Sequence, residues 1–136
     1  MSASRRDKSR ARLIQRATAV LSSLPGVTVA TEGSPALEHH ARYAAAFRVG
    51  SRRFAWLLDN HHGDERLALW LRTEAAVRET LMSADPGTYF IPPYLGRRGW
   101  MGVCLDRQAS WEEIEDLVEA SYRSVASPRL LAQLGG

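Results

Sequence analysis

The chain has 136 residues, 45% of them hydrophobic, with 18 basic and 15 acidic side chains and a formal net charge of +3. This length and apolar content predict one domain over residues 1–136 and exclude two ordinary domains. With a single cysteine, no apolar run of signal-peptide type and no segment of transmembrane length, the sequence predicts a cytoplasmic, monomeric protein without membrane contact, internal disulfide or multi-cysteine metal site.

Charge is unevenly distributed along the chain. Residues 1–53 contain 10 Arg or Lys and 3 acids, a net charge of +7, whereas residues 54–136 contain 8 and 12, a net charge of −4. A basic half within a nearly neutral chain predicts one anion-facing side, such as a surface that meets nucleic acid.

The first predicted element is a helix from a Ser4 cap to about Leu24, ended by Pro25-Gly26. Its basic side is interpreted as a solvated face, with phosphate binding as the alternative. A short β-strand over residues 27–31 follows.

A strand from about residue 42 to 49 is favoured over a helix by the turn that follows it. Gly50-Ser51 is a two-residue hairpin signal that pairs Val49 with Arg52. The apolar residues of the two strands then face each other in an uninterrupted register, Phe47 opposite Phe54.

A second hairpin has its loop over residues 60–65 and pairs Asp59 with Arg66. Both registers predict one apolar core face of the sheet, and they agree with each other. The residues of this face are Tyr43, Phe47, Phe54, Trp56, Leu58, Leu67, Leu69 and Leu71.

A short helix from a Thr73 cap to Met82 and a strand over residues 99–106 come next. A capping box at Ser110 and Glu113 then begins the C-terminal helix. Together these elements predict an α+β fold: a single domain with a mainly antiparallel β-sheet and with an N-terminal and a C-terminal helix packed on one face.

Residues 85–100 place aromatic, proline and arginine side chains in one short connection. Pro92-Pro93 restrict the backbone, and nearby glycines allow sharp turns on either side of Arg97 and Arg98. We therefore expect a fixed loop that presents these two arginines to nucleic acid or another anion.

The predicted registers place Arg48, Arg53 and Arg72 in a row on the opposite face of the sheet, with Trp70 among small alanines beside them. Like charges directly opposite each other destabilise a sheet unless an anion or carboxylate offsets them. We expect the three arginines to bind phosphates and Trp70 to offer a stacking platform. The alternative is that a helix covers this face, Trp70 is partly buried and glutamates of the C-terminal helix pair the arginines.

Candidate metal and catalytic groups give little support for an enzyme. The loop over residues 59–65 is rich in ligand types, but adjacent histidines in a hairpin loop cannot easily both turn inwards. Cys104 lies in a predicted strand, which favours a buried, inert thiol. We expect no catalytic residue, no metal and no cofactor, with a metal enzyme using this loop as a remaining alternative.

A series of motifs resembles, in order, the MmcQ/YjbR family. They span about residues 37–134, and the stretch from the double proline to Gly-Trp is the most specific. The motifs are Phe47-Arg48-Val49, Arg53-Phe54-Ala55-Trp56, His61-His62-Gly63-Asp64, Ala68-Leu69-Trp70, Ala84-Asp85-Pro86, Tyr89-Phe90-Ile91-Pro92-Pro93-Tyr94, Arg98-Gly99-Trp100, Leu105-Asp106, Ser121-Tyr122-Arg123 and Leu130.

The resemblance implies a compact α/β domain, similar in architecture to the frataxin-like fold, in proteins generally described as DNA-binding. It supplies no catalytic residues. Arg53 and Arg72 stand where the family tends to have lysine, which keeps the charge but changes the hydrogen-bond geometry. Glu65 replaces a more usual small turn residue.

The sequence therefore predicts a non-enzymatic DNA-binding protein that contacts mainly phosphates and shows little base preference. The alternative is a module that uses the same surface to bind an acidic protein partner or a phosphorylated small molecule.

Overall fold

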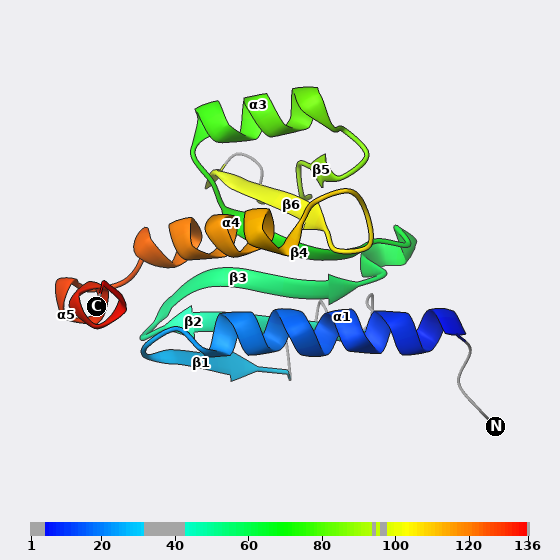
Figure 1. The fold of residues 1–136 in the computed structure, drawn as a ribbon. Helices are drawn as coiled ribbons and strands as arrows, with labels where there is room; N and C mark the ends of the chain where they lie inside the picture. Colours follow the sequence, from blue (N-terminus) through cyan, green and yellow to red (C-terminus); the bar gives the residue numbers. More distant parts are fainter. Residues whose placement is uncertain (1–4, 32–42, 94, 96–97, 136) are drawn as a thin grey trace.

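The computed structural model describes residues 5–31, 43–93, 95 and 98–135. Its centre is a six-stranded antiparallel sheet with the strand order β1-β2-β3-β4-β6-β5 (Figure 1). The strands are β1 (Val27–Ala30), β2 (Tyr43–Val49), β3 (Arg52–Asp59), β4 (Leu67–Arg72), β5 (Tyr89–Phe90) and β6 (Trp100–Cys104).

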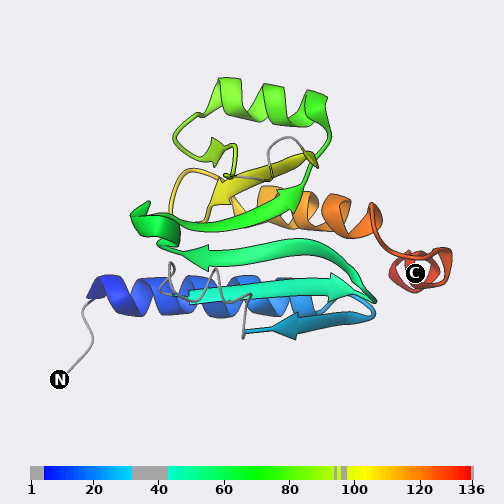
Figure 2. The same cartoon turned by 180° about the vertical axis from the view of Figure 1, so that it is seen from behind.

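The two longest helices, α1 (Arg5–Ser22) and α4 (Trp111–Arg123), cover one face of the sheet. The shorter helices are α3 (Ala75–Ala84) and α5 (Pro128–Leu134), and η1 (His61–Gly63) is a short 3-10 helix. Seen from opposite sides, α1 and α4 lie on the same face, while α3 lies next to β5 at the sheet edge (Figures 1 and 2). The predicted α+β domain with an N-terminal and a C-terminal helix on one face is confirmed. No helix in the described ranges is long and apolar enough to cross a membrane.

The helix-side core lies between this sheet face and the helices α1 and α4. Its largest members are fully buried, and Tyr122 of α4 packs edge-on against Phe54 of β3 at 5.7 Å between ring centroids. They are Leu21, Phe47, Phe54, Leu57, Leu67, Leu69, Leu71, Met101, Val103, Ile114 and Tyr122.

Of the predicted helix caps, one agrees with the structure, one differs, and the Ser4 cap of α1 lies outside the described residues. Ser110 Oγ accepts from the Glu113 N–H at 3.1 Å, as the predicted cap of α4 requires. The Thr73 cap is wrong, because α3 begins at Ala75 with Glu74 as its N-cap. The Thr73 hydroxyl instead donates to the Leu71 carbonyl at 3.1 Å.

The predicted register holds only next to the first turn. Val49 pairs with Arg52 as predicted, but the register shifts between Arg48 and Phe47, so that Phe47 lies opposite Ala55. Phe54 is therefore an extra residue on β3, a β-bulge. The bulge places Phe54 and Ala55 together in the helix-side core.

Beyond the bulge, the side chains of β3 point to the face opposite to the predicted one. Trp56 and Leu58 leave the predicted core face, and this part of the prediction is wrong. The second hairpin is also displaced by one residue: it is closed by the pair Asn60 and Arg66, so that Asp59 lies opposite Leu67. A one-residue slip of this kind reverses the orientation of every following side chain.

The second face of the sheet carries its own apolar cluster, here the second core. Phe90 of the unpredicted strand β5 belongs to it, and Leu95 packs against it. Its members are Ala44, Ala46, Trp56, Leu58, Ala68, Trp70, Phe90, Trp100 and Cys104, all of them buried. Both faces of the sheet are therefore covered over its central strands.

Replacing Gly102 by Ala is expected to lower the free energy of unfolding by about 1–3 kcal/mol, the usual cost of overpacking. A Cβ at Gly102 would lie 2.2 Å from Cζ of Phe90. The ring cannot swing aside freely, because it is buried and the Arg66 guanidinium lies 4.1 Å from its centroid. Urea unfolding measures the change. Gly87→Ala, where the nearest atom is 3.6 Å from the new Cβ, is the control and is expected to change stability by less than about 0.5 kcal/mol.

Ser121 of α4 links the helix to two strands. Its Oγ donates to the carbonyl of Phe54, the bulged residue, at 2.5 Å and accepts from the backbone N–H of Arg72 at 2.9 Å. Because the serine is fully buried, these two bonds satisfy backbone groups that water cannot reach.

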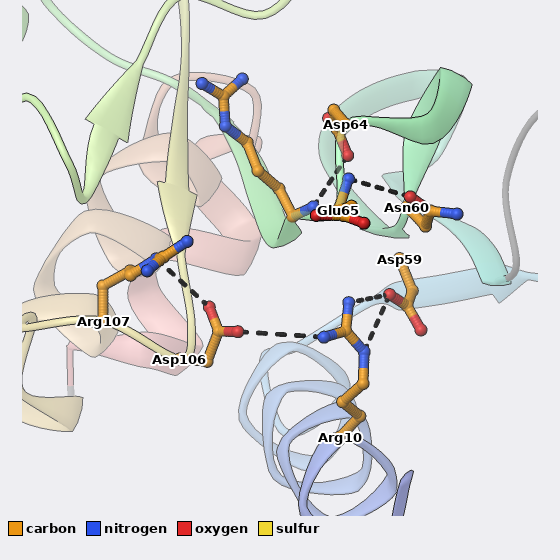
Figure 3. A network of polar contacts seen from close by, with 8 residues as sticks. Arg10, Asp59, Asn60, Asp64, Glu65, Asp106 and Arg107 are labelled. Carbon is orange, nitrogen blue, oxygen red and sulfur yellow. Dashed lines mark hydrogen bonds and ion pairs between the residues drawn. The ribbon is translucent and has the colours of Figure 1, made fainter. Parts of the chain in front are cut away.

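A buried ion pair attaches α1 to Asp59, at the C-terminal end of β3 (Figure 3). Arg10 Nε donates to Asp59 Oδ1 at 3.1 Å, and Arg10 Nη2 contacts the same oxygen. Asp106 Oδ2 lies 4.0 Å from Arg10 Nη1. Arg10 is 7% exposed and Asp59 is 3% exposed, so the pair lies within the protein rather than on its surface.

Candidate nucleic-acid interface

Four arginines gather at the end of the sheet where β2 turns into β3 and where β4 and α4 end, on the left in Figure 1. Arg48 lies opposite Arg53 in the β2–β3 ladder. Arg72 Nε donates to the Arg53 carbonyl at 2.8 Å. The structure thus brings together the three arginines predicted to form a row. With the exposed Arg52 at the turn they are here called the arginine cluster.

Two guanidinium groups of the cluster lie on aromatic rings of the second core. The Arg53 guanidinium is 4.2 Å from the Trp56 ring centroid, and that of Arg72 is 5.0 Å from the Trp100 centroid. Such cation–π contacts hold long side chains in place. The arginines are therefore half-buried and anchored rather than freely solvated.

The positive charges of the cluster oppose one another. Burial lowers the pKa of Arg53, and the charges of Arg48 and Arg72 lower it further. Burial also lowers the pKa of Arg72, with a contribution from Arg52. Arginine nevertheless stays protonated in proteins, so the repulsion persists at neutral pH.

Carboxylates do not offset this repulsion within the described part of the chain. There, no carboxylate oxygen lies within 4.0 Å of an arginine of the cluster. The Nε atoms of Arg48 and Arg53 are buried without a hydrogen-bond partner. The glutamates of α4 therefore do not neutralise the cluster, and no carboxylate of the described residues compensates its positive charge.

Trp70 lies on the predicted face but is not a stacking platform. It is 4% exposed and belongs to the second core. The His61 ring contacts it edge-on, with 4.9 Å between centroids. Because no ring face is open to a base, the predicted stacking role of Trp70 is wrong. The alternative expected Trp70 to be partly buried, and the structure buries it almost completely.

Of the two arginines in the proline loop, Arg98 is exposed and Arg97 lies outside the described residues. Arg98 lines a groove of about 660 Å³ together with Arg72 and with Arg123 at the end of α4. The groove runs between α4 and the connection from β4 to α3. Its other lining residues are Thr73, Glu74, Val77, Gly99, Leu117, Ala120 and Ser124.

Sequence reasoning missed Arg52 and Arg123 as members of this basic end. Arg123 was visible as a basic residue in the last turn of a well-capped helix. Its nearness to Arg72 depends on where α4 ends relative to β4, and no local pattern encodes that.

The loop over residues 59–65 has the contacts of a turn. Asn60 Oδ1 accepts from the Glu65 N–H at 2.8 Å, and Asp64 Oδ1 accepts from the Arg66 N–H at 2.9 Å (Figure 3). Within the described ranges, no group of three or more His, Cys, Asp or Glu side chains could hold a metal. Cys104 is buried, and burial raises the pKa of its thiol.

Comparison with known proteins finds a family model and a solved structure that resemble this chain. The family model described as YjbR matches residues 22–124. Among solved structures, the fold is similar to the crystal structure of Deinococcus radiodurans protein DR2400, which has a DUF419 domain. The TM-score is 0.67 at 22% sequence identity, over 90% of this chain and 87% of that chain. No curated protein gave a significant match.

Proposed function

The chain belongs to the YjbR family, and we propose that it is a non-enzymatic DNA-binding protein that contacts the phosphate backbone through the arginine cluster. Arg97 and Arg98 of the proline loop assist. The observation that carries the proposal is the uncompensated positive charge of Arg48, Arg53 and Arg72, which a bound polyanion would offset.

The geometry favours phosphates over bases. Arg53 and Arg72 are anchored on tryptophan rings, which leaves their terminal nitrogens to meet an anion from a fixed direction. A planar guanidinium suits bidentate contact with phosphate. The tryptophans under the cluster are buried and offer no stacking surface, which favours duplex DNA over single strands held by their bases.

Salt dependence tests this proposal. Retention of a duplex of about 20 base pairs, measured by fluorescence anisotropy, is expected to weaken with a log–log salt slope of about −3. This slope counts one phosphate for each of Arg48, Arg53 and Arg72, at about −0.9 per neutralised phosphate. Between 50 and 200 mM salt this slope corresponds to a loss of about 60-fold. Duplexes of unrelated sequence should behave alike. Failure to retain any duplex at 50 mM salt would contradict the proposal.

A further inference from the structure

The groove beside the arginine cluster has the size of a small-molecule site. Its volume of about 660 Å³ falls within the range of roughly 300–1,000 Å³ that is usual for ligand pockets. Arg72, Arg98 and Arg123 reach it from a strand, a loop and a helix. Contact with the outside of a duplex does not require such a hollow.

The charges that line the groove suit a doubly charged anion. Three arginines and one carboxylate, that of Glu74, give the lining a net charge of +2. The hydroxyls of Thr73 and Ser124 donate to backbone carbonyls, so the arginines are the main donors left for a ligand. A phosphate diester carries one negative charge, whereas a phosphate monoester carries nearly two at neutral pH.

Two arginines of the groove are available to a ligand. Arg98 is exposed, and the described residues place no carboxylate within 4.0 Å of it. Arg123 contacts Glu119 at 3.4 Å, but both side chains are nearly half exposed, so this contact holds the guanidinium only weakly. Arg72 also lines the groove, but its Nε donates to the Arg53 carbonyl and its guanidinium lies 5.0 Å from the Trp100 ring centroid, so it contributes positive charge more than free donors.

Part of the groove lining is apolar. Val77 of α3 and Leu117 and Ala120 of α4 lie among the charged residues. A ligand with an anionic end and a less polar body can therefore satisfy both parts of the lining, as pocket ligands commonly do.

We propose that this groove binds a phosphate monoester, with Arg98 and Arg123 holding the phosphate, Arg72 adding positive charge at the lining, and the apolar residues contacting the organic part. The monoester has two chemical sources, a free phosphorylated metabolite or the terminal phosphate of a nucleic-acid strand. The site goes beyond backbone contact and uses Arg98 and Arg123, which lie outside the arginine cluster.

Phenyl phosphate is a suitable probe, with phenyl sulfate as the singly charged control of similar shape. Calorimetric titration of the full chain is expected to show saturable binding of phenyl phosphate and at least about tenfold weaker binding of phenyl sulfate. Arg123→Gln is expected to weaken phenyl phosphate binding by about tenfold or more, since a charge-assisted hydrogen bond is lost. Arg129→Gln, an exposed arginine of α5 outside the groove, is the matched control and should bind as the unmodified chain does.

Two short thymidine oligonucleotides, with and without a 5′-phosphate, distinguish the sources. Preference for the phosphorylated oligonucleotide over phenyl phosphate assigns the groove to strand ends, and the reverse assigns it to metabolites. Equal binding of phosphate and sulfate, absence of saturable binding, or an Arg123→Gln variant that binds normally would overturn the proposal. Because Arg123 is outside the arginine cluster, this variant should retain duplex DNA, so failure here is distinguishable from failure of the proposed function.

Discussion

Replacing Asp59 by Asn is expected to lower the free energy of unfolding by about 3–5 kcal/mol, because it removes the charge of a carboxylate that the buried Arg10 guanidinium contacts twice. Arg10 is held by two contacts to a single Asp59 oxygen, whereas Asp106 lies farther away, at 4.0 Å. Arg10→Met should have a similar cost by leaving the Asp59 carboxylate buried. Denaturant unfolding followed by circular dichroism measures both variants.

The double variant Arg10→Met with Asp59→Asn provides the sharper test. If the two groups act as a pair, the losses should be strongly non-additive, since neither charge is then left uncompensated. The exposed Arg12 lies on the same helix, and Arg12→Met should change stability by less than about 0.5 kcal/mol. Additive losses would show that the pair does not attach α1 to the sheet.

Replacing Arg48 and Arg53 together by Gln is expected to weaken duplex binding by about 100-fold at low salt and to make the salt slope less steep by about 2. Stability should change by less than about 1 kcal/mol. Removing two charges relieves repulsion within the arginine cluster, which offsets the lost contact of Arg53 with Trp56. Anisotropy titration and urea unfolding of the same preparation measure both quantities.

A matched variant separates local from overall charge. Arg12→Gln with Arg129→Gln removes the same number of charges from exposed positions on α1 and α5. It should alter duplex binding by only a few-fold, through net charge alone. If both double variants weakened binding equally, the arginine cluster would not be the DNA contact.

Local patterns predicted the elements of the fold better than their register. The Gly50-Ser51 turn and the Ser110 cap act over a few residues, and both are correct. The bulge at Phe54 could not be predicted, because β3 is apolar at every position from Phe54 to Leu58. When both faces of a strand are buried, alternation carries no information about which residue faces which core.

The arginine row was predictable because Arg48 and Arg53 lie between the turn and the bulge, where the register is still the simple one. The sequence offered partial burial of Trp70 only as an alternative. Its almost complete burial was not predictable, since it depends on a second core completed by Phe90 in a two-residue strand too short to show a pattern. The groove could not be predicted from the sequence either, because Arg98, Arg123 and Arg72 line it together only as a result of tertiary packing.

The hydroxyl of Ser121 has a consequence for recognition. By joining the backbones of Phe54 and Arg72 to α4, it fixes the strands that carry Arg53 and Arg72 against the helix that carries Arg123. These arginines are thus held in place before any ligand arrives. Binding therefore does not include the entropic cost of ordering the strands and the helix that carry them. Recognition of this preorganised kind should proceed as rigid docking, with backbone shifts of less than about 1 Å between the free and bound protein.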